Sequence, residues 1–240
     1  MTVCMYGMGR FGRFWAEELS RVVPDMRGYN RSDREFPPTV KRVSFEEMCA
    51  SDVIILTTAI SSMEEVLKAI APHIKKDALI MDCCSVKVWP VEMMEKYLPA
   101  ETEILATHPM FGPDSGKNGV EGLPIVVSPV RIAREREEEW LRIFQALKLT
   151  IHVMTPDEHD REAAFTQGIT HFIGRILGDM HLEESPIATS GYKSLQRIME
   201  QTCNDDWQLF MDLQKLNPHT EEMRSKLDRT LAKMIKYLQP

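Results

Sequence analysis

Two short polar segments of this 240-residue chain carry the side chains best suited to chemistry. One is 83–87, Cys-Cys-Ser-Val-Lys, which contains Ser85, and the other is 107–116, which contains His108. Both follow apolar runs that predict buried strands. An imidazole suits general base catalysis near neutral pH because its ordinary pKa is about 6.5. The pattern therefore predicts a proton-accepting histidine at His108, one strand away from Ser85.

The N-terminal segment predicts a site for a dinucleotide. Residues 2–6 are mostly apolar and run into a turn with three glycines, after which residues 13–23 predict a helix. Gly7 permits a tight turn, Gly9 lets the backbone approach a pyrophosphate, and Gly12 lets the helix pack on the strand. Because a helix start offers unpaired N–H groups to phosphates, the expected cofactor contacts are Gly7, Met8, Gly9, Arg10, Phe11 and Gly12. A turn of purely conformational origin is the alternative.

The end of the second expected strand favours NADP over NAD. NAD-binding units usually place an acid there, which accepts hydrogen bonds from the ribose hydroxyls. Here Asn30 stands in that place, Arg31 can pair with a ribose 2′-phosphate, and Ser32 can donate a hydroxyl. Arg31 as a solvated turn residue is the competing interpretation. Thr57 and Thr58 follow the third strand and are expected to lie against the same cofactor.

Alternating strand and helix patterns predict a doubly wound α/β sheet, and the alternation ends near Met154. We expect a Rossmann-type NADP-binding domain over 1–154 and an all-helical substrate and dimerisation domain over 155–240. Further strands are expected at 52–56, 78–82, 103–106, 123–128 and 150–154, and C-terminal helices at 158–180, 192–202, 205–216 and 220–238.

Two of the C-terminal helices carry apolar stripes at helical spacing. On the first helix we expect the stripe to pack and the opposite face, with Gln167, His171 and Arg175, to meet a ligand. That stripe comprises Phe165, Ile169, Phe172, Ile173, Ile176 and Met180, and the stripe of the last helix comprises Met223, Leu227, Leu231, Met234 and Leu238. Because a helical domain of this size is marginal alone, a homodimer through the C-terminal helices is expected.

Composition excludes several classes of protein. With 29 Lys and Arg against 36 Asp and Glu, the formal net charge is −7 and no basic run is present, so nucleic acid is not an expected partner. No apolar run approaches the roughly 20 residues that span a bilayer, and no charged leader precedes an apolar core, so we expect a cytoplasmic protein with no membrane partner. The five cysteines lack disulfide or zinc spacing, which predicts reduced thiols and no metal.

The chain resembles the prephenate and arogenate dehydrogenases of tyrosine biosynthesis, particularly the plant-like arogenate branch. The resemblance rests on ATHPMFGPDSG, DCCSVK, the Gly7–Gly12 turn, TPDEHDREAAFTQGITHFIGRIL and SGYKSLQRIMEQTCNDDWQLFMDLQKLNP. It implies NADP-linked oxidative decarboxylation. The hydroxyl-bearing ring carbon would give hydride to the nicotinamide, His108 would accept the hydroxyl proton, and the ring carboxylate would leave as carbon dioxide while the ring becomes aromatic.

The resemblance also implies roles for individual residues. Ser85 matches a serine that hydrogen-bonds the substrate hydroxyl and orients the histidine. Pocket positions are matched by Ser115, Gln167, His171 and Thr189, and Arg197 matches a carboxylate-binding arginine of the bacterial prephenate branch. Ordinary structural alternatives are a helix cap at Thr189 and a solvent-facing Gln167.

Asp205 bears on the choice of substrate. Arogenate has a side-chain ammonium that prephenate lacks, and a carboxylate in the pocket would favour the amine. The resemblance implies an acid at this position in arogenate-specific members, so arogenate is the predicted substrate. A helix cap is the competing role for Asp205.

Three alternative functions remain beside this prediction. They are prephenate dehydrogenase, a reductase of the same plan such as the pyrroline-5-carboxylate reductases, and a catalytically silent NADP-binding sensor. Such a reductase would not need the loop of His108 in this form. A sensor would tolerate loss of both Ser85 and His108, so their joint presence argues against it.

Overall fold

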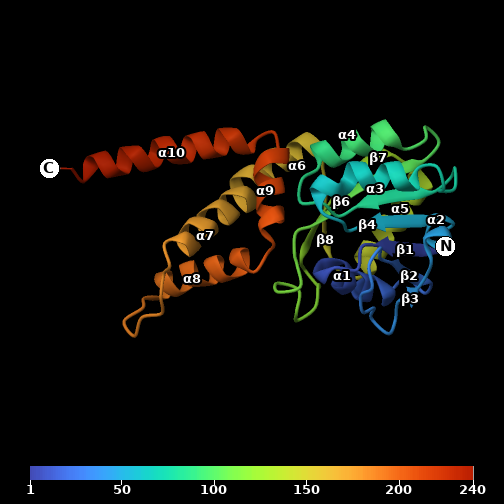
Figure 1. Ribbon diagram of the computed structural model, residues 1–240, viewed down its shortest axis with the longest axis horizontal. Helices are drawn as coiled ribbons and strands as arrows, with labels where there is room; N and C mark the ends of the chain where they lie inside the picture. The colour runs from blue at the N-terminus through green and yellow to red at the C-terminus, as the bar shows by residue number, and fades with distance from the viewer. Residues whose placement is uncertain (240) are drawn as a thin grey trace. The chain divides into compact units, whose positions relative to one another are not determined.

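A computed structural model describes residues 1–239 of the chain, which divides into two compact units, Met1–Pro156 and Asp157–Pro240. The first unit is an α/β sandwich and the second is helical (Figure 1). The predicted fold class, a doubly wound sheet followed by a helical C-terminal region, is confirmed.

The sheet of the first unit has eight strands in the order β3-β2-β1-β4-β5-β6-β7-β8. Neighbouring strands are parallel except β6 and β7, which are antiparallel. The strands are β1 (Val3–Tyr6), β2 (Met26–Tyr29), β3 (Lys41–Arg42), β4 (Val53–Leu56), β5 (Leu79–Asp82), β6 (Glu103–Pro109), β7 (Pro124–Arg131) and β8 (Thr150–Val153). Because β1, β4, β5 and β6 are parallel, the segments that follow them meet at one edge of the sheet.

Helices cover the sheet because its central strands are apolar on both faces. Successive side chains point to opposite faces, and Met5, Ile55 and Met81 lie in one buried cluster with Trp15 of α1 and Trp140 of α5. The helical segments of this unit are α1 (Arg10–Ser20), α2 (Phe45–Cys49), the 3₁₀ turn η1 (Ile60–Ser62), α3 (Met63–Ile70), α4 (Val88–Tyr97) and α5 (Arg134–Ala146).

The second unit contains α6 (Pro156–Ala163), η2 (Ala164–Gly168), α7 (Ile169–Asp179), α8 (Ser190–Cys203), α9 (Trp207–Leu216) and α10 (Thr220–Tyr237). The single helix expected over 158–180 is therefore interrupted, because η2 is a π-helical segment. There the side-chain amide of Gln214 donates to the carbonyl of Gly168 at 2.9 Å. Single π turns inside α-helices are frequent at functional sites.

The faces of α7 differ from the expectation. Half of the apolar stripe stays exposed in the single chain, with 36% of Phe165, 39% of Ile176 and 62% of Met180 accessible, and the rest of the stripe is only partly buried, whereas His171 of the polar face is 6% exposed. Packing against α8 explains the reversal. A Cβ on Gly174 would lie 2.0 Å from Oγ1 of Thr202, so α8 approaches α7 on the side where the glycine and His171 lie.

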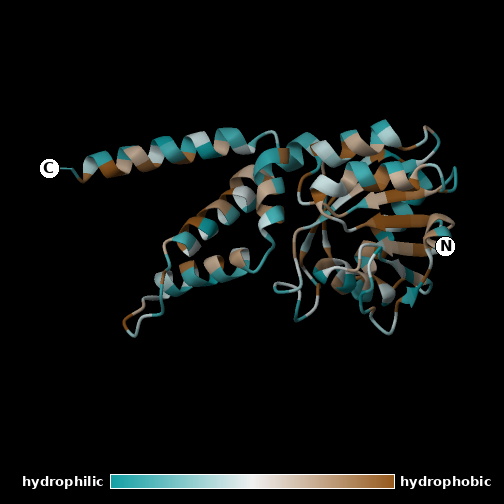
Figure 2. Cartoon of the chain, viewed as in Figure 1, coloured by the Kyte–Doolittle hydropathy of each residue, from teal (hydrophilic) through white to brown (hydrophobic). Residues whose placement is uncertain are grey.

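The apolar stripe of α10 is also exposed over most of its length. Met223 is buried, but Leu231, Met234 and Leu238 are 55%, 48% and 85% accessible. Figure 2 shows hydrophobic residues along the outer part of this helix. No helix within residues 1–239 is long and apolar enough to cross a membrane.

Candidate functional site

The turn between β1 and α1 has the backbone geometry that the three glycines predict. Gly7 has φ +111°, and a Cβ there would come within 2.9 Å of the carbonyl oxygen of Thr57. A Cβ on Gly12 would lie 1.8 Å from the carbonyl oxygen of Gly7, whereas a Cβ on Gly9 would meet nothing within 4 Å. The first and third glycines are therefore needed for packing, and the second leaves the backbone accessible at the start of α1.

Two residues predicted to contact the cofactor hold this turn in place. Oγ1 of Thr57 donates to the carbonyl of Gly7 at 2.6 Å, so its hydroxyl proton is directed at the turn. Oδ1 of Asn30 accepts from the backbone N–H of Met8 at 2.8 Å, and its amide nitrogen donates to the carbonyl of Ser32 at 2.9 Å. Thr57 and Asn30 thus shape the site through its backbone.

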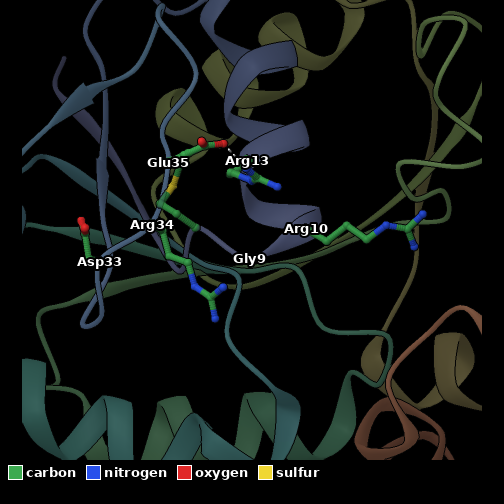
Figure 3. Close-up of a pocket in the computed structure, with 7 residues that line it drawn as sticks. Gly9, Arg10, Arg13, Asp33, Arg34 and Glu35 are labelled. Carbon is green, nitrogen blue, oxygen red and sulfur yellow. Dashed lines mark hydrogen bonds and ion pairs between the residues drawn. The ribbon is translucent and has the colours of Figure 1, made fainter.

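A pocket of about 320 Å³ opens beside Gly9 and lies between the glycine turn and the loop after β2 (Figure 3). Its lining residues are Met8, Gly9, Arg10, Arg13, Asp33, Arg34 and Glu35. Arg10 pairs with Asp114, and Arg13 lies 3.4 Å from the Glu35 carboxylate. Figure 3 shows the Arg34 side chain extending on one side of Gly9 and Arg10 on the other. Three arginines and two acids line the pocket, which gives the lining a formal net charge of +1, and a guanidinium can pair with a phosphate.

Arg31 lies outside this lining. Its guanidinium pairs with Glu65 at 3.0 Å, and 79% of its side chain is exposed. Sequence analysis missed Arg13 and Arg34. Arg34 could have been considered from the sequence, because it lies three positions after Arg31 in the same loop. Of the other predicted contacts, Met8 is buried, Phe11 packs near Phe14, and Thr58 lies 4.0 Å from the sulfur of Met63.

A buried ion pair joins the turn of Ser85 to the strand of His108. The side chains of Lys87 and Asp82 are both 0% exposed. Nζ of Lys87 donates to the Asp82 carboxylate and, at 2.6 Å, to the carbonyl of Thr107. The same carboxylate accepts the backbone N–H of Cys84 at 2.9 Å. The residue before Ser85 and the residue before His108 are therefore linked through the ion pair of Asp82 and Lys87.

His108 is the penultimate residue of β6 and is 3% exposed. The strand runs three residues further than the sequence predicted, because residues 104–109 pair with the antiparallel β7, where His108 is opposite Val126. Ser85 is half-buried in the turn between β5 and α4. Burial raises the pKa of the neighbouring thiol of Cys83 to about 12 and also raises the pKa of Cys84, which disfavours the reactive thiolate form of both.

The remaining predicted residue of the first unit, Ser115, closes a local turn. Its Oγ accepts the backbone N–H of Gly112 at 2.9 Å. In the second unit Thr189 is the N-cap of α8 and accepts the N–H of Tyr192 at 3.2 Å. Arg197 is exposed and donates to Oγ of Ser194 at 2.9 Å. All three have a structural role in the single chain.

A second polar cluster lies within the helical unit. Gln167, His171 and Arg175 follow one another at intervals of four along η2 and α7. Nε2 of His171 lies 3.9 Å from Oδ2 of Asp205. Burial and the charge of Arg175 lower the pKa of His171 to about 4, so its ring is neutral at pH 7. Within the described residues, Oε1 of Gln167, Nδ1 of His171 and Nε of Arg175 are buried with no hydrogen-bond partner.

The glycine turn after β1, the cationic pocket beside it and a buried histidine in β6 at the same sheet edge define a nucleotide-dependent dehydrogenase. The nucleotide-binding domain of prephenate dehydrogenases matches residues 39–143, and the domain described as "TYRAAT1-like, C-terminal domain" matches residues 176–240. The chain is 36% identical to "Arogenate dehydrogenase 2, chloroplastic" of Arabidopsis thaliana over 99% of its own length and 70% of that relative. It belongs to the prephenate and arogenate dehydrogenase family.

Other relatives are longer than this chain. It is 36% identical to "Arogenate dehydrogenase 1, chloroplastic" of Arabidopsis thaliana over 92% of the chain, but spans only 37% of that protein. Among solved structures, prephenate dehydrogenase from A. aeolicus with hydroxyphenyl propionate and NAD+ superimposes with a TM-score of 0.75 over 99% of this chain and 91% of its own. Synechocystis arogenate dehydrogenase gives 0.69 over 100% and 94%. Both are 18% identical in sequence and share the fold.

Proposed function

We propose that this protein converts arogenate to tyrosine by oxidative decarboxylation with NADP. Members of its family catalyse this NAD(P)-dependent reaction on arogenate or prephenate. The observation that carries the proposal is the placement of His108, which is buried at the end of β6 directly after Thr107, whose carbonyl accepts a hydrogen bond from Lys87 of the turn that follows β5. A buried, immobilised imidazole near the nucleotide edge suits proton removal during oxidation.

In the proposed reaction, His108 and Ser85 act on the ring hydroxyl of the substrate. His108 accepts the proton of the ring hydroxyl, and Ser85 hydrogen-bonds that hydroxyl. The glycine turn would hold oxidised NADP, which would supply the hydride acceptor for the same carbon. The C–C bond to the ring carboxylate then breaks, carbon dioxide leaves, and the bond's electron pair completes the aromatic ring. The proton that His108 accepted returns to the resulting phenolate oxygen, so arogenate with an ionised ring carboxylate loses one hydride and one carbon dioxide overall and becomes neutral tyrosine.

NADP is the proposed cofactor because the pocket beside Gly9 is cationic and because Asn30 replaces the acid of NAD sites. The turn itself fits a dinucleotide, since Gly9 leaves its backbone open while Gly7 and Gly12 permit the close turn. We assign the 2′-phosphate to Arg34, with Arg13 beside it, because both line the pocket. Arg31 is held by Glu65 instead.

Arogenate is the proposed substrate because the helical unit presents a carboxylate within its polar cluster. Asp205 is 30% exposed beside a neutral His171. An anionic side chain attracts the ammonium of arogenate and repels the keto acid side chain of prephenate. A helix cap is the competing role for Asp205, although the N-cap residue of α9 is Asp206.

An assay with both substrates and both cofactors tests this function. Purified protein is mixed with arogenate or prephenate and NADP or NAD, and the absorbance of the reduced nicotinamide is followed. The proposal requires the highest kcat/KM for arogenate with NADP. Preference for prephenate would reassign the substrate, and absence of turnover in all four mixtures would favour a nucleotide-binding sensor.

Three further roles complete the proposal. The first unit binds the cofactor, the helical unit supplies substrate-recognition residues, and the protein is a homodimer through its C-terminal helices. The exposed stripes on α7 and α10 support the dimer, because large apolar faces on a soluble chain are usually covered by a partner.

The cytoplasm is the proposed compartment, although two Arabidopsis relatives carry the word chloroplastic in their names.

A further inference from the structure

We propose that Gln214 is a positioning residue for the substrate: its side-chain amide holds the π turn η2 so that the side chain of Gln167 meets a hydrogen-bond donor of the substrate. The inference rests on the proposed function, because the substrate in question is the one which that function assigns. Gln214 is given no contact with the substrate and acts through η2 alone.

The π turn decides which side chains of this helical segment share a face. In η2 the backbone N–H of Ile169 donates to the carbonyl of Ala164, five residues earlier. One extra residue in a turn rotates the side chains that follow by about 100° relative to an uninterrupted α-helix, because each residue of an α-helix turns by that angle. Single π turns are rare and are often found at functional sites. The direction of every side chain of α7 relative to α6 thus depends on η2.

The helix is anchored separately before and after η2. Before it, the side-chain amide of Asn217 donates to the carbonyl of Asp160 at 2.8 Å. After it, Gly174 packs against α8 so closely that a Cβ there would lie 2.0 Å from Oγ1 of Thr202. Because these two contacts fix α6 and α7 independently, the π turn takes up the difference in their rotation.

Gln214 contacts the turn itself. Its Nε2 donates to the carbonyl of Gly168 at 2.9 Å, and its Oε1 accepts from Nη1 of Arg224 at 3.1 Å. Oγ1 of Thr220 donates to the backbone carbonyl of Gln214 at 2.9 Å. A guanidinium is only a donor, so it orients the amide with its oxygen towards Arg224 and its nitrogen towards η2. Gln214 is buried, and these contacts give its amide a single orientation.

The residue before Gly168 presents an open acceptor. Oε1 of Gln167 is buried and has no hydrogen-bond partner within residues 1–239, and the same holds for Nδ1 of His171, four residues further on. Residues four apart lie on one face of a helix. Buried polar atoms are nearly always paired, and an unpaired one costs stability. An amide oxygen needs a donor, so the missing partner fits an N–H or O–H group of a polar substrate.

The test is a double-mutant cycle between Gln214 and Gln167 in the full chain. The variants are Gln214→Met, Gln167→Met and the double variant, because methionine keeps the length of glutamine and removes its hydrogen bonds. The matched control is Gln145→Met, which makes the same change at an exposed position of α5. For each protein, kcat and KM are measured at saturating NADP with arogenate or prephenate, whichever the unaltered protein oxidises with the higher kcat/KM. Circular dichroism and thermal unfolding report folding.

We expect Gln167→Met to raise KM about fivefold, the scale of one hydrogen bond, and Gln214→Met to raise it about threefold. The values of kcat should stay within about twofold, since the proton-accepting His108 is unchanged. The double variant should have the KM of Gln167→Met alone, because Gln214 acts through that side chain. Gln145→Met should match the unaltered protein.

Arg224→Met tests the same contact with a milder change, in case Gln214→Met does not fold. It removes the cation that orients the amide of Gln214 and leaves the amide in place. This variant should also raise KM, by about twofold to threefold, and should add nothing further when it is combined with Gln167→Met.

Three results would overturn the inference while the proposed function stands. If Gln214→Met lowers the unfolding temperature but leaves KM unchanged, the role of Gln214 is structural. If Gln167→Met leaves KM unchanged, or if the two single effects multiply in the double variant, Gln214 does not act through Gln167. The proposed function fails in a different way: the unaltered protein then oxidises neither arogenate nor prephenate, and the inference falls with it.

Discussion

At the scale of single residues, the proposed recognition of NADP depends on the arginines beside the glycine turn. Arg34 lines the pocket beside Gly9, whereas Arg31 is paired with Glu65 on α3. We predict that Arg34→Gln raises the dissociation constant of adenosine 2′,5′-bisphosphate about tenfold, because a charge-assisted contact to the 2′-phosphate is lost. Isothermal calorimetry measures this without catalysis. Adenosine 5′-monophosphate, which lacks the 2′-phosphate, should bind the unaltered protein and Arg34→Gln equally. If Arg31→Gln loses more affinity for the bisphosphate than Arg34→Gln does, Arg31 and not Arg34 binds the 2′-phosphate.

A second single residue, His171, makes the stability of the fold depend on pH. The pKa of His171 falls from 6.5 in the unfolded chain to about 4 in the fold. Below pH 6.5 the unfolded state therefore binds a proton that the folded state resists, so stability decreases as the pH falls from 6.5 towards 4. Between pH 7 and pH 5 we expect a loss of about 2 kcal/mol from this group. Urea unfolding should show that the free energy of unfolding falls less between pH 7 and pH 5 in His171→Gln than in the unaltered protein. An equal fall in both proteins would show that His171 is not the group responsible.

At the scale of elements, the pair of Lys87 and Asp82 couples β5, the start of α4 and β6. Replacing Lys87 by Met leaves the carboxylate buried without its cation, which should lower the free energy of unfolding by about 3–5 kcal/mol. The double variant with Asp82→Asn should recover most of this stability, as urea unfolding would show. If the single substitution costs less than the double, the ion pair does not hold these elements together.

Local signals explain which elements could be predicted from the sequence. The glycine turn and the strands depend on backbone permissiveness and on short apolar runs, so Gly7, Gly12 and the strand before Thr57 could be placed without the structure. The π segment η2 and the buried face of α7 could not. They depend on Gln214 and on the approach of Thr202 to Gly174, which are distant in sequence. The pairing of Arg31 with Glu65 likewise depends on the fold.

At the scale of the whole molecule, the exposed apolar residues of α7 and α10 are the basis of the proposed homodimer. We predict that the unaltered protein sediments as a dimer and that Leu231→Glu with Leu238→Glu yields monomers, because two charges would be buried in the apolar interface. Arg229→Glu changes the charge of the same helix away from the stripe and should remain dimeric. A stable monomer of the unaltered protein at micromolar concentration would rule out the proposed assembly.

The central claim is that His108 removes the hydroxyl proton while arogenate is oxidised. The most direct measurement is kcat for arogenate with saturating NADP in the unaltered protein and in His108→Asn, with NADP affinity measured in both. Loss of a general base should lower kcat by about 10²–10⁴-fold and leave the affinity unchanged. If His108→Asn keeps its turnover, the proton goes elsewhere and the proposed mechanism is wrong.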